Sequence, residues 1–348
     1  MKMEDVARLA NVSKSAVSLA FSGKPGIGSD TRERILQVAD EVGYVPRSRT
    51  TGISAVKVDR SLMFLVCTNS GIVLEQYYQQ PFFKELIHFV EERCRQNGYS
   101  LMFSTVDVEF FERDIRVITE EKRSDGVIVL GTNLTRTQIH DIHEKLPNLI
   151  VLDTCFETLP VQFIQINNVM GAYQAGAYLC DIGHTSIGYI ASNVRIHNFD
   201  ERRRGFMNAL QERGIVIPEE RILAVAPTIL TSQDALKQQL TAYLDNGYTL
   251  PTAWFCECDY IAISAMKTLG ELGIRVPDDT SVIGFDNINE SLIVSPELTT
   301  IHVEKERMAA LAVDLLSEYI EHGRQVTAKI TVDTHFVERK SCAAPVVT

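Results

Sequence analysis

The 348-residue chain lacks the features that mark membrane, secreted and nucleotide-cofactor proteins. No apolar run approaches the roughly 20 residues that span a membrane. No signal-peptide pattern precedes the first amphipathic segment, so we expect a cytoplasmic protein. Neither a Gly-x-Gly-x-x-Gly sequence nor a Walker loop occurs, and we therefore expect no cofactor.

Cysteine is present, but not in a disulfide or zinc pattern. The seven cysteines are an odd number at irregular spacings, which fits a reducing compartment. Cys256 and Cys258 stand at the end of an expected strand, where alternate side chains face opposite sides. A zinc site would need two further ligands, and no second cysteine pair lies nearby. We therefore expect reduced thiols and no metal ion.

Catalytic constellations are also missing. The sequence shows no nucleophile–base pair and no paired carboxylates at convincing spacing. We therefore expect a protein that is not an enzyme, and keep an enzyme on the same fold as a remote alternative.

Charge is divided unevenly along the chain. Residues 1–60 hold ten Lys and Arg against seven Asp and Glu, a net of +3, whereas the remainder holds 24 against 38, a net of −14. A basic head on an acidic body is typical of a phosphate-binding module joined to a domain that does not bind nucleic acid.

The basic head reads as two short helices joined by a tight turn, followed by a third helix. Asn11 tolerates the left-handed backbone that ends a helix, and Ser13 is a good N-cap for the next one. The third helix opens at Ser29 or Asp30. Apolar residues at helical spacing predict one buried face on each helix: Val6, Leu9 and Ala10 on the first; Val17, Ala20 and Phe21 on the second; Ile35, Val38, Ala39 and Val42 on the third.

The outer face of the second helix is unusually short-chained, with Lys14, Ser15, Ser18, Leu19 and Ser22. Short side chains let a helix approach the floor of the DNA major groove. Serine and lysine can bond phosphates or base edges, and leucine can pack on a thymine methyl. This is the helix-turn-helix plan, in which the second helix lies in the major groove. The alternative is a small three-helix bundle that contacts protein.

From about Ser61 onward, short apolar runs alternate with amphipathic segments, in two successive series. Such alternation predicts α/β lobes with doubly wound parallel sheets and helices on both faces. Ligands in this architecture bind at the carboxyl ends of strands, here facing a cleft between lobes. The expected strands are 62–67, 99–104, 126–131, 149–153, 186–191, a strand near 222, 252–256 and 281–285; the expected helices are 82–97, 109–122, 169–181, 200–213, 233–246 and 260–272.

Several motifs together resemble the LacI/GalR family of bacterial transcription regulators. In the head these are Asp5-Val-Ala-Arg-Leu-Ala-Asn-Val-Ser13, Ala16-Val-Ser18, Thr31-Arg-Glu-Arg-Ile-Leu36 and Gly43-Tyr-Val-Pro46. In the body they are Gly183-His-Thr-Ser-Ile-Gly188, Arg202-Arg-Arg-Gly-Phe206, Val276 to Asn287 and Pro296-Glu-Leu-Thr-Thr-Ile301. The resemblance covers Met1 to about Arg339. It implies a helix-turn-helix headpiece and a two-lobed core like that of periplasmic sugar-binding proteins.

The family pattern also implies where the domains divide. The headpiece is expected over 1–46 and a hinge over 47–60. The first lobe of the core is expected over 61–164 and 300–325, and the second over 165–299 and 326–340. Residues 341–348 are expected to form a tail.

The resemblance places an effector in the cleft. It implies that Arg202 binds effector hydroxyls or a carboxylate, and that Asp286 accepts hydrogen bonds at a strand end. The alternatives are a surface arginine and a helix cap. Asn69 and Tyr77 follow the first strand and are expected to line the cleft, although Tyr77 could simply cover the core. Cys258 stands where the family commonly has Asn, which weakens a plain free-sugar assignment, as does Asn167-Asn168 in place of Asp-Asn.

On the DNA side, Lys14, Ser15 and Leu19 are expected to read bases, and Ser18, Ser22 and Arg32 to hold phosphates. Ile53 occupies the position of a leucine that the family wedges between base pairs in the minor groove. Thr50, Thr51 and Gly52 are poor helix formers, so we expect this hinge to fold only on DNA. A plain flexible linker is the alternative.

These inferences predict a bacterial cytoplasmic repressor, found on the nucleoid when bound to its operator. It would bind a pseudo-palindromic DNA operator as a homodimer. A small-molecule effector, a sugar or sugar derivative, would change its affinity for DNA. The alternative is control by a phosphocarrier protein instead of a small ligand.

Overall fold

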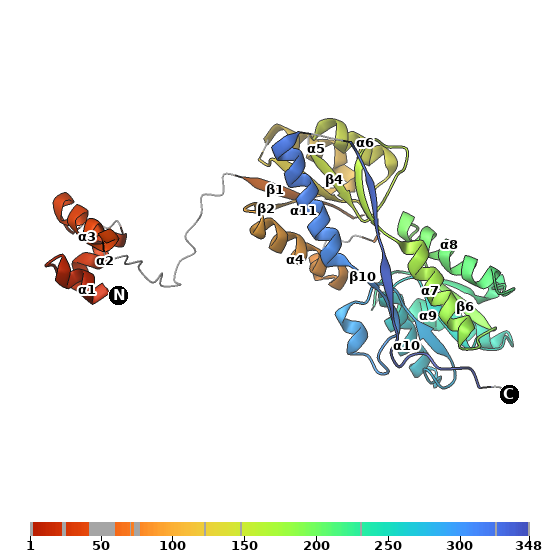
Figure 1. Cartoon of the computed structure of the whole chain (residues 1–348). Helices are drawn as coiled ribbons and strands as arrows, with labels where there is room; N and C mark the ends of the chain where they lie inside the picture. Colours follow the sequence, from red (N-terminus) through yellow and green to blue (C-terminus); the bar gives the residue numbers. More distant parts are fainter. Residues whose placement is uncertain are drawn as a thin grey trace. The chain divides into compact units, whose positions relative to one another are not determined.

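The computed structural model describes residues 3–22, 26–41, 60–69, 71–72, 77–121, 123–146, 148–229, 232–323 and 326–346 (Figure 1). The chain divides into two compact units, Met1–Lys57 and Val58–Thr348. The first is the headpiece, and the second is the core. The headpiece boundary expected at residue 46 falls within residues 42–59, which lie outside the described residues. The hinge boundary expected at residue 60 lies directly after them. Within the described residues, no helix combines the length and apolar content needed to cross a membrane.

The headpiece consists of the three expected helices, α1 (Met3–Leu9), α2 (Lys14–Ser22) and α3 (Ser29–Glu41). Asn11 has a φ of 52°, and the hydroxyl of Ser13 accepts a hydrogen bond from the backbone N–H of Ala16 at 3.2 Å. The turn and the N-cap are therefore as predicted. The small core contains Val6, Ala7, Ala10, Val17, Ala20, Ile35 and Ala39.

One prediction about the first helix is wrong. Leu9 was expected in the buried face but is 53% exposed, whereas Ala7 is buried. The buried stripe of α1 passes through Val6, Ala7 and Ala10, so the buried face is rotated toward Ala7 from the predicted one.

The first lobe of the core is a six-stranded parallel sheet in the order β11-β5-β4-β3-β1-β2. Helices α4 and α11 pack on the face that carries Phe64 and Ile128, and α5 and α6 pack on the face that carries Leu65 and Val129. The strands are β1 (Ser61–Thr68), β2 (Ser100–Asp107), β3 (Gly126–Leu130), β4 (Leu149–Leu152), β5 (Gln162–Ile166) and β11 (Lys329–Val332); the helices are α4 (Pro81–Gln96), α5 (Phe111–Glu121), α6 (Arg136–Lys145) and α11 (Lys305–His322).

The second lobe is a four-stranded parallel sheet in the order β7-β6-β8-β9. Phe206 of α8 stacks on Phe255 of β8 with ring centroids 4.3 Å apart, while Tyr243 of α9 meets Trp254 on the opposite face. The strands are β6 (Ile187–Ser192), β7 (Ile222–Val225), β8 (Ala253–Cys256) and β9 (Ser281–Ile283); the helices are α7 (Asn168–Asp181), α8 (His197–Gln211), α9 (Gln233–Asp245) and α10 (Asp259–Glu271). Four short 3-10 helices lie in the connections: η1 (Tyr77–Gln79), η2 (Val108–Phe110), η3 (Glu219–Arg221) and η4 (Asn289–Leu292).

Two antiparallel strands connect the lobes, β10 (Thr300–Val303) and β12 (Thr334–Val337). Bridges from Ile283 to Thr299 and from Asp286 to His302 tie β10 to the second lobe. After β10 the chain enters α11 of the first lobe, and it returns through β12.

The lobe boundaries therefore differ from the predicted ones. Residues 326–340 were assigned to the second lobe, but β11 pairs with β5 in the sheet of the first lobe. Conversely, residues 300–303 were assigned to the first lobe and are bridged to the second. The divisions fall near residues 303 and 333. Ser341, expected in a tail, is fully buried against the second lobe, where its hydroxyl donates to the carbonyl of Val282.

Candidate functional site

A small cavity lies between the two lobes of the core. Its volume of about 40 Å³ leaves room for about three water molecules. The first lobe contributes Ile72, Gln80, Phe82, Phe83, Thr132 and Asp153 to its walls, and the second lobe contributes Ile196, Asn198, Phe199, Arg202, Pro227, Cys258, Tyr260 and Asp286.

The guanidinium of Arg202 in α8 is fixed by two hydrogen bonds, an ion pair and an aromatic ring. Its Nε donates to Asn168 Oδ1 at 2.9 Å, and its Nη1 donates to the carbonyl of Glu257 at 2.7 Å. Its Nη2 lies 2.9 Å from Asp286 Oδ1, and the guanidinium stands 3.8 Å from the centroid of the Phe285 ring. The side chain is 4% exposed, so this is not a surface arginine.

Asp286 follows β9 at the carboxyl edge of the second sheet and has a φ of 117°. Its Oδ1 forms the ion pair with Arg202, but no well-aligned donor reaches this oxygen among the described residues. Burial raises the pKa of its carboxyl, and the charge of Arg202 opposes that rise. Its backbone carbonyl accepts from Lys305 Nζ at 3.1 Å, and Lys305 pairs in turn with Glu85 of the first lobe.

Asp153 brings a second buried carboxyl into the cavity, at the end of β4 in the first lobe. Its Oδ2 accepts from the Thr132 hydroxyl at 2.5 Å, and its Oδ1 accepts from Asn198 Nδ2 at 2.9 Å. Asn198 belongs to the second lobe, so this hydrogen bond crosses the cavity. Burial raises the pKa of the Asp153 carboxyl to about 6, against the opposing effects of Thr132, Arg202 and Asn198.

Two further contacts hold the lobes together around the cavity. The backbone N–H of Phe82 in α4 donates to the hydroxyl oxygen of Tyr260 in α10 at 3.0 Å. Lys305 of α11 donates to the carbonyl of Asp286. Hydrogen bonds from both lobes therefore converge on the walls of one cavity.

Another buried carboxylate, Glu257, supports the cavity from behind. Both of its oxygens lie 2.8 Å from Arg195 Nη1, and it also accepts from the Tyr189 hydroxyl and the backbone N–H of Ser192. Burial raises the pKa of Glu257, and the hydrogen bond from Arg195 opposes that rise. Because the backbone carbonyl of Glu257 accepts from Arg202, this cluster positions the guanidinium.

Three of the five residues predicted for the effector site line the cavity: Arg202, Asp286 and Cys258. The Cys258 thiol is buried, which raises its pKa, and all seven cysteines are free thiols. Asn69 and Tyr77 are not among the lining residues. Asn69 donates instead to Asp107 at 2.8 Å, and Tyr77 is buried in the core of the first lobe.

Sequence reasoning missed four polar groups of the cavity: Thr132, Asp153, Asn198 and Tyr260. Asp153 carried a usable signal, because it directly follows the apolar strand Leu149–Leu152 at the edge where ligands bind. The other three gave none, because their positions depend on how the lobes meet.

The outer face of α2 in the headpiece is largely exposed to solvent. Lys14, Ser15 and Ser18 are exposed, and Arg32 at the start of α3 is half-buried. Leu19 was expected to be exposed but is half-buried, and a Cβ on Gly26 would lie 3.2 Å from its Cδ1. The side chain of Ser22 and the whole of Ile53 lie outside the described residues.

Comparison with known proteins gives two matching family models. Residues 2–47 match the model described as bacterial regulatory proteins, lacI family, and residues 177–342 match that of a periplasmic binding protein-like domain. The HTH-type transcriptional repressor PurR of Pasteurella multocida is 33% identical over 343 residues, which cover 97% of this chain and 98% of that protein. The repressor of the same name from Photobacterium profundum is 31% identical over 342 residues, with the same shares of the two chains covered.

Solved structures of the same architecture cover nearly the whole chain. The Lac repressor dimer bound to operator and an anti-inducer superposes with a TM-score of 0.71 at 22% identity, covering 99% of both chains. A complex of the transcriptional regulator CelR with cellobiose superposes with a TM-score of 0.70 at 23% identity, covering 98% of this chain and 99% of that one. These matches confirm the predicted fold class.

Proposed function

This chain belongs to the lacI family of bacterial regulatory proteins, and we propose that it acts as a dimer on a pseudo-palindromic operator under the control of a sugar-like effector. It is a DNA-binding transcriptional repressor with an effector-binding core, and its relatives are repressors rather than enzymes.

The cavity between the lobes is the observation that carries the proposal. Its walls carry neutral hydrogen-bond donors, the guanidinium of Arg202 and the carboxylates of Asp153 and Asp286. The aromatic rings of Phe199 and Tyr260 line the same cavity. Small-molecule sites combine an apolar lining with a few fixed polar groups in this manner. A sugar has hydroxyls for the polar groups and C–H faces for the aromatic rings. The cellobiose complex of CelR and a ribose-bound regulator from Enterococcus faecium support the same ligand class.

The size of the cavity supports control through movement of the lobes. The cavity of about 40 Å³ is smaller than the roughly 300–1,000 Å³ of small-molecule sites, so we propose that the effector binds with the walls further apart. Widening must stretch the contacts that cross the cavity, including Asn198 to Asp153 and Phe82 to Tyr260. An effector that binds the wider form better than the closed form shifts the population toward it.

On the DNA side, we propose that α2 enters the major groove. Lys14, Ser15 and Leu19 face bases, while Ser18, Ser22 and Arg32 hold phosphates. Ile53 is proposed as the minor-groove wedge. A dimer presents two such helices to two half-sites, which is why the operator should be pseudo-palindromic.

Thermal shift and operator binding together test the proposal. The protein is screened against neutral sugars, sugar phosphates, nucleosides and purines, and each stabilising compound is added to an operator-binding assay. A ligand at 100 times its Kd stabilises the folded state by about 2.7 kcal/mol. We expect at least one neutral sugar to stabilise the protein and change its DNA affinity.

Two arginine variants connect that response to the cavity. Arg202→Lys keeps the charge but loses the fork, and should abolish the ligand response. Arg204→Ala removes an exposed arginine two residues away, which pairs with Glu201 on the surface, and should respond as the wild type does. Equal responses in the two variants would refute the proposed site. A complete lack of response to the whole panel would instead favour a protein partner such as a phosphocarrier.

A further inference from the structure

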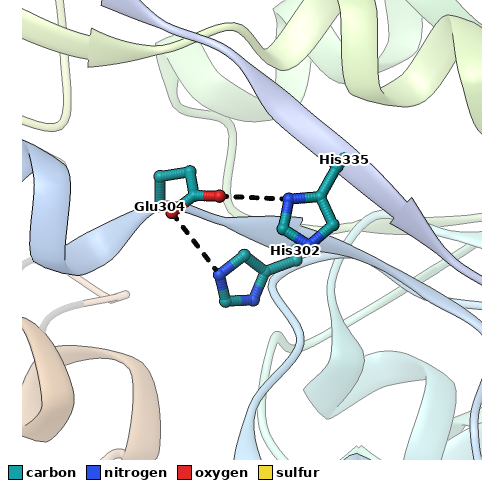
Figure 2. Close-up of side chains that lie close together, drawn as sticks. All are labelled: His302, Glu304 and His335. Atoms are coloured by element: carbon teal, nitrogen blue, oxygen red, sulfur yellow. Dashed lines mark ion pairs between the residues drawn. The ribbon is translucent and has the colours of Figure 1, made fainter.

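Three side chains able to bind metal gather on the connecting strands (Figure 2). His302 of β10 and His335 of β12 are direct cross-strand partners, with ring centroids 4.6 Å apart. Glu304 follows His302 by two residues, and its carboxylate reaches both rings. Glu304 Oε1 lies 3.0 Å from His335 Nδ1, and Oε2 lies 3.9 Å from His302 Nε2.

We propose that His302, Glu304 and His335 form a binding site for one divalent transition-metal ion of the zinc type, with water in the remaining positions. Two imidazole nitrogens and one carboxylate oxygen are donors that zinc, cobalt and nickel prefer over magnesium. One ligand atom from each residue already lies within 4.8 Å of the other two. Ligands at about 2.0–2.2 Å from a tetrahedral zinc ion are about 3.3 Å apart, so small side-chain movements suffice.

Access favours binding. The His335 side chain is 58% exposed, and those of Glu304 and His302 are 39% and 28% exposed. An ion can therefore reach the cluster without unfolding of either lobe. Without an ion, His335 Nδ1 lies 3.0 Å from a carboxylate oxygen that can only accept, so a proton on Nδ1 donates to Glu304. Once Nδ1 binds metal, the proton moves to Nε2.

His302 requires one rearrangement, which the surrounding hydrogen bonds define. Asn287 Oδ1 accepts from Arg339 Nη2 at 2.6 Å, which fixes the amide so that its Nδ2 faces His302 Nδ1 at 2.8 Å. His302 therefore carries its proton on Nε2, the atom nearest Glu304. Binding through Nε2 moves that proton to Nδ1 and turns the Asn287 amide, so that Oδ1 accepts it. Arg339 then loses its bond to Asn287 Oδ1, and its Nη2 must move away from the turned Nδ2, while its Nη1 keeps the bonds to Ser291 and Leu298.

The position of this site connects it to the cavity. His302 is bridged to Asp286, and Lys305, directly after Glu304, donates to the Asp286 carbonyl. A bound ion would tie β10 to β12 where both pass between the lobes. Metal binding itself does not depend on the proposed function. Its effect on the effector response rests on that function and is a separate measurement.

The test is zinc affinity of the full-length, chelator-treated protein, measured by competition with a fluorescent zinc chelator. We expect one ion per chain, with no competition from magnesium at equal concentration. Cobalt should give the weak visible bands of nitrogen and oxygen ligands without a thiolate charge-transfer band, which separates this site from the seven cysteines. Wild-type protein that binds no zinc, or that shows the thiolate band, would overturn the proposal.

Four variants test the proposed site. His335→Ala and Glu304→Gln should each weaken zinc binding by at least about tenfold. His140→Ala, which removes an exposed histidine of α6, is the matched control and should bind as the wild type does. Asn287→Asp places an acceptor before His302 Nδ1 without rearrangement and should strengthen binding. Unchanged affinity in His335→Ala and Glu304→Gln would refute the site, and no gain in Asn287→Asp would refute the assigned rearrangement. Circular dichroism of each metal-free variant checks its fold.

Discussion

Asp153 allows a quantitative prediction, because a single isosteric substitution removes its charge. Its two carboxyl oxygens accept from Thr132 and Asn198 within the cavity, and the side chain is buried. In Asp153→Asn the amide oxygen can still accept from Asn198. The new amide N–H can donate to Thr132, whose hydroxyl rotates to accept. The variant therefore keeps the packing and both hydrogen bonds while removing the ionisation.

The expected magnitude follows from the pKa. Folding raises the pKa of this carboxyl from 3.8 to about 6 because burial disfavours its charged form. A group with a raised folded pKa contributes stability that is present below the unfolded pKa and is lost as the pH rises through the folded pKa. The total loss is about 3 kcal/mol, at 1.36 kcal/mol per pKa unit, and about 2 kcal/mol of it falls between pH 4.5 and 7.5. Asp153→Asn removes this loss.

We therefore expect Asp153→Asn to gain about 2 kcal/mol relative to wild type when the pH is raised from 4.5 to 7.5. Urea unfolding followed by tryptophan fluorescence measures this in the core alone, because Trp254 is the only tryptophan and is fully buried in β8. Glu220→Gln, at an exposed position of η3, is the control and should stay within about 0.5 kcal/mol of wild type. If Asp153→Asn, compared with wild type, is as destabilised at pH 7.5 as at pH 4.5, or more so, the raised pKa of the Asp153 carboxyl is refuted.

Three other predictions concern helix packing and DNA. A Cβ on Gly205 of α8 would lie 2.1 Å from the carbonyl oxygen of Val169, so Gly205→Ala should destabilise the core by more than about 2 kcal/mol in the same urea assay. Gly270→Ala, in a helix with open space around it, should instead gain about 0.5–1 kcal/mol. Lys14→Ala should weaken operator binding and lower the slope of log affinity against log salt by about 1, whereas exposed Lys267→Ala in α10 should leave both unchanged.

Local chemistry explains which parts of the fold were predictable. The turn at Asn11 and the cap at Ser13 depend on single residues and their neighbours, and both are present. The helix Arg136–Lys145 and the strand Gln162–Ile166 were not predicted. The helix buries only Ile139 and Ile142, and the strand contains two glutamines, so neither shows a strong apolar period.

The same distinction holds for the cavity. Arg202 and Asp286 were predicted because they belong to sequence motifs, whereas Asn198 and Lys305 were not. Asn198 matters because Asp153 of the other lobe lies opposite it, and Lys305 matters because it reaches the Asp286 carbonyl. Contacts between lobes join residues that are far apart in the chain, so no local sequence pattern predicts them. The prediction of the lobe boundary near residue 333 was wrong for the same reason, since β11 is identified only by its pairing with β5.

The contact between Arg202 and Asp286 gives a physical reason for expecting a hydroxyl-bearing effector. Arg202 uses Nε and Nη1 on well-aligned acceptors, but its Nη2 meets Asp286 Oδ1 as an ion pair without an aligned hydrogen bond. A hydroxyl inserted between them would accept from Nη2 and donate to Oδ1, and so would give this buried carboxylate oxygen an aligned hydrogen-bond donor. An anionic group would relieve Nη2 but would repel Asp286 and Asp153. Because the Asp286 carbonyl is held by Lys305 of the first lobe, a hydroxyl that displaces Asp286 acts directly on a contact between the lobes. Asp286, the proposed effector-binding residue, is thus also a residue that positions the lobes.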